Sequence, residues 1–184
     1  MKKLLLVVLL LASVGASAQM KPVERKRYLR PKKDENCAYV FNVTKNTDED
    51  SEADGAVTRL AYRPYAELLA EIDALRKMNN WADSTYQRRF STLPAGGTLV
   101  ITMLRRGAQN ADPAYLALSA KDKDGKVLLA QESLPAGSGR FWNRDLYTSQ
   151  RTIPFVKTET PQEVSIVIND AKLKQDFMYL VKTQ

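Results

Sequence analysis

Hydrophobic and polar residues alternate through most of the second half of the chain. Short apolar stretches recur there roughly every 8 to 15 residues and are separated by turn-forming residues. Side chains of a strand point alternately to its two faces, so this pattern predicts half-buried strands. The expected strands are 37–45, 56–62, 98–104, 115–120, 127–131, 145–155, 163–168 and 176–182.

One segment, 65–78, has the periodicity of a helix instead. Its apolar residues lie three or four positions apart, with charged residues between them. Pro64 precedes the segment and suits the first turn of a helix, where a missing N–H costs nothing. The next segment, 81–93, contains three aromatic residues and fits either a further helical face or a packed connection.

Turn chemistry supports an antiparallel arrangement of the strands. Asp124 and Gly125 separate two expected strands, and both residues tolerate the positive φ of a tight turn, which predicts a β-hairpin. Strands at this spacing without alternating helices are typical of a sandwich. The sequence therefore predicts a mainly β protein, an antiparallel β-sandwich of immunoglobulin-like or C2-like kind, with one amphipathic helix inserted near 65–78. The single cysteine excludes the antibody-type version.

The N-terminus has the three parts of a signal peptide. Lys2 and Lys3 are followed by an apolar run and then by a sequence that ends in Ala16-Ser17-Ala18. The apolar run is much shorter than the roughly 20 residues that a membrane-spanning helix needs. We therefore expect residues 1–18 to be removed near Ala18, leaving a secreted or periplasmic protein without a transmembrane span.

Charge divides the remaining chain into two parts. Without Lys2 and Lys3, the 28 basic residues become 26, against 21 acidic ones. All of the excess lies in 19–33, where dense positive charge and two prolines predict a disordered tail. This leaves 34–184 as a single, nearly neutral β-sandwich domain. The tail residues proposed to bind are Arg25, Lys26, Arg27, Lys32 and Lys33.

Two interpretations of this basic tail stay open. It either attaches the protein to an anionic surface, such as lipid headgroups or acidic polysaccharide, or is only a flexible leader. Nucleic acid is not an expected partner, because the protein is exported and the tail has one aromatic residue, Tyr28.

The absence of histidine narrows the possible chemistry. The chain has no His to activate a serine or a thiol, or to serve as a zinc ligand, so we expect no enzymatic activity and no cofactor. Cys37, the only cysteine, is expected to be a buried thiol. The alternative is a disulfide with another chain, because the exported protein would work in an oxidising compartment.

Asp122 and Asp124 are weak candidates for calcium ligands. Their offsets before Gly125 match part of a calcium loop, but Ala120 and Gln131 occupy the two positions where that loop needs carboxylates, so the EF-hand reading fails. The alternative is a looser, C2-like site, in which these carboxylates meet Asp112 or Asp170 at one end of a sandwich.

Aromatic and dibasic pairs complete the candidates. Phe141 and Trp142 follow a glycine-rich stretch, and we expect them to lie in a loop and to pack against the protein, with an exposed binding contact as the alternative. The pairs at 88–89 and 105–106 are arginines, and we expect both pairs to be solvated surface.

The function expected from the sequence is that of an exported, non-catalytic binding or envelope-associated module. Its partner would be an envelope protein, a glycan or an anionic surface. A C2-like, calcium-assisted lipid binder and a carboxylate-based hydrolase are the alternatives.

Overall fold

The computed structural model describes residues 37–44 and 56–184. The chain divides into the units 1–33 and 34–184, and all described residues belong to the second, compact unit. The expected signal peptide and basic tail, including Arg25, Lys26, Arg27, Lys32 and Lys33, lie outside the described residues.

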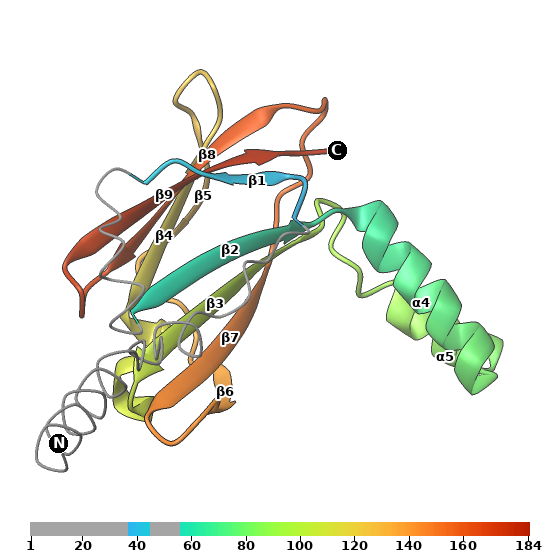
Figure 1. The fold of residues 1–184 in the computed structure, drawn as a ribbon. Helices are drawn as coiled ribbons and strands as arrows, with labels where there is room; N and C mark the ends of the chain where they lie inside the picture. Colours follow the sequence, from blue (N-terminus) through green and yellow to red (C-terminus); the bar gives the residue numbers. More distant parts are fainter. Residues whose placement is uncertain (1–36, 45–55) are drawn as a thin grey trace, which may run out of the picture. The chain divides into compact units, whose positions relative to one another are not determined.

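The described chain contains two antiparallel sheets (Figure 1). The first sheet has the order β1-β9-β8-β4-β5 and the second has the order β2-β3-β7-β6. The strands of the first sheet are β1 (Val40–Asn42), β4 (Leu116–Lys121), β5 (Val127–Gln131), β8 (Glu163–Asp170) and β9 (Gln175–Lys182). Those of the second are β2 (Val57–Arg63), β3 (Thr98–Arg106), β6 (Ser138–Phe141) and β7 (Leu146–Pro154). The prediction of a mainly β, antiparallel protein is confirmed, and the two sheets are consistent with a sandwich. The choice between immunoglobulin-like and C2-like topology stays a prediction.

A single hydrophobic core is built from side chains of both sheets. Alternate residues of β3 point into it, and Leu99, Ile101 and Met103 are fully buried. Alternate residues of β8 and β9 contribute in the same way from the other sheet. Because the side-chain period of a strand is two, the core follows directly from the alternation in the sequence.

The predicted helix is confirmed as α4 (Tyr65–Asn79), which starts directly after Pro64. Asn80 caps its end with a left-handed φ of 50°, a conformation that asparagine tolerates better than most residues. The segment that the sequence left open forms a second helix, α5 (Asp83–Phe90). Two short 3₁₀ segments, Ala108–Asn110 and Pro113–Tyr115, lie between β3 and β4.

The two helices are an insertion between neighbouring strands. Arg63, the last residue of β2, is the direct partner of Thr98, the first residue of β3. A short turn would therefore be enough to join these strands, and residues 64–97 replace it with a pair of helices that contact each other. None of the residues of α4 and α5 belongs to the hydrophobic core cluster. Among the described residues, no helix has the length and apolar character needed to cross a bilayer.

Candidate functional site

The strongest candidate site lies on the β6–β7 hairpin, at the edge of the second sheet. Trp142 donates its backbone N–H to the carbonyl of Leu146 across 2.7 Å and so extends the ladder past β6. The Asn143 side chain accepts hydrogen bonds from the backbone N–H groups of Asp145 and Leu146, at 3.0 and 2.8 Å. Side-chain bonds of this kind hold a tight turn. The hairpin therefore fixes the backbone of Trp142 in a defined place.

A shallow hollow of about 340 Å³ lies beside Trp142. It is lined by residues of β3, β6 and β7 together with this indole. The strand residues are Thr102, Ser138, Gly139, Arg140, Thr148, Ser149 and Gln150. Five of these seven strand residues carry a hydroxyl or amide group, and such groups both donate and accept hydrogen bonds.

The pairing register explains how this hollow forms. Gln150 lies between Thr102 of β3 and Ser138 of β6, and Thr148 is opposite Arg140. Directly paired residues share one face of a sheet, and this face is opposite to the one that carries Ile101 and Met103 into the core. The hollow therefore lies on the outer face of the second sheet.

The structure separates the two aromatic residues that the sequence analysis treated as one pair. Phe141 belongs to β6 and contacts Tyr147 edge-on, with the ring centroids 5.1 Å apart. Phe141 does not line the hollow, whereas Trp142 does. The expectation that both residues pack against the protein was wrong, because they are 59 % and 56 % exposed. Phe141 ends the edge strand β6, whereas Trp142 lies in the connection to β7, as expected.

Gly139 is required by the close approach of Tyr147. A Cβ at position 139 would overlap the Tyr147 ring and the backbone oxygen of Thr148. The absence of a side chain therefore allows the aromatic ring to lie against the edge strand.

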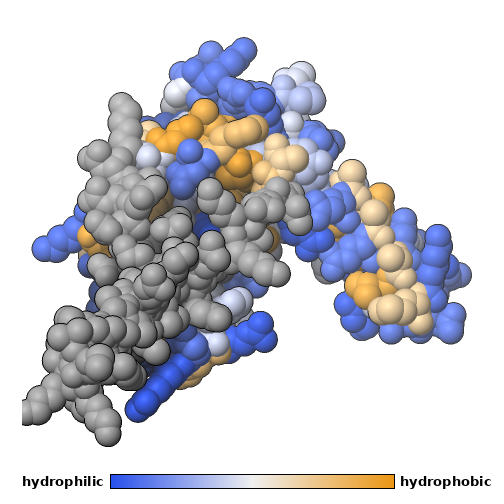
Figure 2. Space-filling model, in the orientation of Figure 1, coloured by the Kyte–Doolittle hydropathy of each residue, from blue (hydrophilic) through white to orange (hydrophobic). Residues whose placement is uncertain are grey.

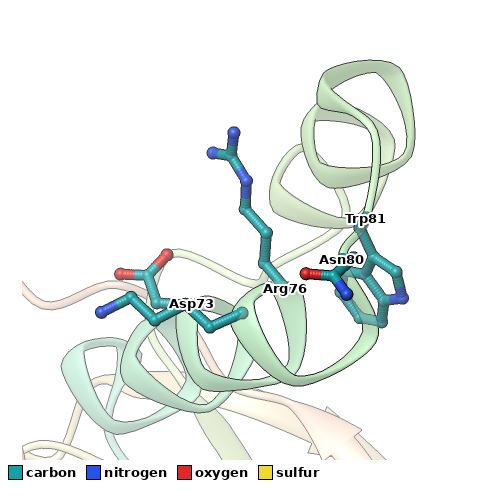
Figure 3. A pocket seen from close by; sticks show the side chains of 5 residues that line it. Asp73, Arg76, Asn80 and Trp81 are labelled. Atoms are coloured by element: carbon teal, nitrogen blue, oxygen red, sulfur yellow. The ribbon is translucent and has the colours of Figure 1, made fainter.

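A second hollow, of about 480 Å³, lies on the helical pair (Figure 3). Its lining residues come from the last turns of α4 and from the connection to α5. They are Asp73, Arg76, Lys77, Asn80 and Trp81. The sequence did not predict a site at Trp81, because its segment, 81–93, fits either a helix or a packed connection.

The calcium candidates are placed at opposite ends of a strand. Asp122 follows the last residue of β4, whereas Asp170 is paired with the first residue, Leu116. The Asp122 carboxylate accepts hydrogen bonds from the N–H groups of Asp124 and Lys126 within its own turn. Within 37–44 and 56–184, no group of three or more metal-ligating side chains is close enough to hold a metal ion. The C2-like calcium site stays a prediction, and the positions of Asp122 and Asp170 do not support it.

Asp170 instead forms a buried ion pair with Arg105. The Arg105 Nη2 lies 2.7 Å from Asp170 Oδ2, and the two side chains are 3 % and 0 % exposed. Arg105 also donates to the Thr58 hydroxyl, and the Tyr179 hydroxyl donates to the Thr58 carbonyl. Burial lowers the pKa of Arg105 and raises that of Tyr179, because each would be charged in a region without water.

This cluster corrects the expectation that both arginines at 105–106 are solvated surface. Arg105 points inward and joins β3 to β8 of the other sheet, while Arg106 is exposed. The sequence contained a signal for the inward position of Arg105, since this residue continues the inward alternation of Leu99, Ile101 and Met103. The cluster is fully enclosed, so we assign it a structural role.

Cys37 lies beside the backbone of β2. Its sulfur accepts a hydrogen bond from the N–H of Tyr62 at 3.4 Å, and the residue is only half-buried. The chain has no second cysteine, so a disulfide within it is impossible, and the disulfide with another chain stays a prediction.

Comparisons with protein-family models, with curated proteins and with solved structures find no match to this chain.

Proposed function

We propose that this chain is an exported, non-catalytic binding module that holds an envelope glycan against the outer face of β3, β7 and β6. The observation that carries the proposal is the exposed indole of Trp142 beside a hollow lined by hydroxyl and amide groups. Export rests on the signal-peptide pattern of residues 1–18.

The chemistry of the hollow suits a sugar better than an apolar ligand. Sugar hydroxyls both donate and accept hydrogen bonds, and the side chains of Thr102, Thr148 and Gln150 can do the same. The flat, electron-rich face of an indole favours the C–H groups on one face of a sugar ring. Binding sites commonly combine such an aromatic surface with a few placed polar groups.

Arg140 adds one positive charge to the rim. It is exposed and lies on the same face as Thr148, its direct partner in β7. A guanidinium binds carboxylate in a bidentate way, so a glycan that contains acidic sugars would gain an additional contact.

The test replaces Trp142 and measures retention on purified cell-wall glycan. We expect Trp142→Ala to weaken binding by about thirtyfold, because a central aromatic contact is worth about 2 kcal/mol. Oligosaccharides cut from the same glycan should release the parent protein from it.

Phe41→Ala is the matched control. Phe41 is an aromatic residue of similar exposure, 47 %, but it lies on β1 in the other sheet. Retention should be unchanged in this variant. If Trp142→Ala and Phe41→Ala bind the glycan equally well, or if the parent protein does not bind it, the proposed function is wrong.

A further inference from the structure

Most residues of the helical pair α4–α5 are exposed. Leu68 is the only buried residue of α4, and α5 has none. Met78 is 71 % exposed and Phe90 is 36 % exposed. Figure 2 shows apolar and hydrophilic side chains side by side on α4 and α5. Neither the core nor the joining of β2 to β3 requires these helices, so their surface is available for another role.

The charge on this surface is positive beyond the middle of α4. Within 73–90, two acidic residues, Asp73 and Asp83, stand against four basic ones, and Asp83 pairs with Arg76 at 2.5 Å. The basic residues are Arg76, Lys77, Arg88 and Arg89. By contrast, the domain 34–184 as a whole has slightly more acidic than basic residues. The far part of the helical pair is therefore a local basic region on a nearly neutral domain.

Aromatic rings are interleaved with these cations. The Arg89 guanidinium lies 4.4 Å from the centre of the Trp81 ring, and Arg76 lies at the same distance from Tyr86. Tyr86 in turn stacks on Phe90, with the ring centroids 6.1 Å apart. Each of these two arginines is thus held against an aromatic ring of the helical pair.

We propose that the turn between α4 and α5, with its hollow around Trp81 (Figure 3), is a docking surface for an anionic lipid bilayer. Lys and Arg are attracted to anionic headgroups, and Trp concentrates at the membrane–water interface. Met78 is the exposed apolar residue next to Lys77 and provides the group that would enter the interface. This proposal is independent of the glycan site, because it uses no residue of the second sheet.

The experiment measures binding to vesicles made of equal parts phosphatidylglycerol and phosphatidylcholine. The protein used lacks residues 1–18, whose removal leaves the compact unit 34–184 whole. Lys77→Glu changes the charge at the turn by two units, and each unit near an anionic membrane corresponds to about fivefold in affinity. We therefore expect Lys77→Glu to bind at least fivefold more weakly, and Met78→Ser to bind several-fold more weakly.

Lys123→Glu is the matched control, because it makes the same change in net charge at the exposed β4–β5 turn. Its binding should stay close to that of the parent. The basic tail is present in all of these proteins, so its attraction does not affect the comparison. Thermal unfolding of each variant checks that the fold is intact; Lys77 and Met78 are exposed, so little change is expected.

The proposal is overturned by either of two results. One is that the parent binds these vesicles no better than pure phosphatidylcholine vesicles. The other is that the two turn variants bind as tightly as Lys123→Glu, which would assign the attraction to the tail alone. Glycan retention is measured on the same variants and should be unchanged, so failure of this proposal is distinguishable from failure of the proposed function.

Discussion

Removing one partner of the buried pair Arg105–Asp170 should destabilise the protein strongly. Both side chains are almost completely inaccessible to water, and the contact joins β3 of one sheet to β8 of the other. In Arg105→Met the Asp170 carboxylate keeps its bonds from the N–H groups of Lys172 and Leu173, at 2.9 and 3.0 Å, but loses its ion pair with Arg105. Breaking a buried pair in this way costs about 3 to 5 kcal/mol.

That cost is large compared with the stability of a typical domain, which is about 5 to 15 kcal/mol. Asp170→Asn should cost a similar amount, because it leaves the Arg105 guanidinium buried without a counter-charge. The double variant should cost much less than the two single variants added together, since neither charge is then left alone. Urea unfolding followed by circular dichroism gives all three free energies.

Arg63→Met is the control for this series. Arg63 pairs with Glu67 and Glu71, but these side chains are between 35 % and 51 % exposed. Ion pairs at the surface contribute about 0 to 1 kcal/mol, so the same substitution should have little effect there. If Arg105→Met costs no more than Arg63→Met, or if the two single variants add in the double variant, the reasoning about the buried pair is wrong.

Two further predictions concern ionisation and packing. Burial raises the pKa of Tyr179 and of Tyr62 in the folded protein. An unfolded tyrosine ionises at about pH 10, so the stability that these two residues contribute is complete below that pH. It is lost as the pH rises from there toward the pKa values of the folded state. Urea unfolding between pH 9 and pH 11 measures this loss. In Tyr179→Phe the free energy of unfolding should fall less steeply with pH, by up to about 1.4 kcal/mol per pH unit. An unchanged slope would contradict the prediction. Gly139→Ala should destabilise the β6–β7 hairpin by about 1 to 3 kcal/mol, because the added Cβ overlaps Tyr147 and the backbone of Thr148. A thermal midpoint equal to that of the parent would show that the edge strand shifts without cost.

The two proposed surfaces assign different roles to different parts of the fold. The outer face of β3, β7 and β6 presents hydrogen-bonding groups with one indole, whereas the α4–α5 turn presents cations and apolar side chains. A module with both would bind a glycan while it is held near a membrane. Joining two binding surfaces in one chain would raise the effective concentration for the second contact.

The sequence alone determined most of the secondary structure. Alternation with a period of two identified all strands of the described chain except β6, because the sheets bury one face. Spacing of three and four residues identified α4. It also contained the signal for the buried pair. Arg105 continues the inward positions of β3, and Asp170 continues those of β8 after Val164, Ile166 and Ile168.

Only the tertiary structure decided which strands are neighbours and in which register. That register places Thr102, Gln150 and Ser138 in one row across three strands, although they are far apart in the chain. It also decides that Arg105 meets Asp170 and that Trp142, but not Phe141, faces the hollow. Periodicity tells which face of a strand is buried, but the choice of neighbouring strand depends on contacts between distant segments, which a local pattern does not contain.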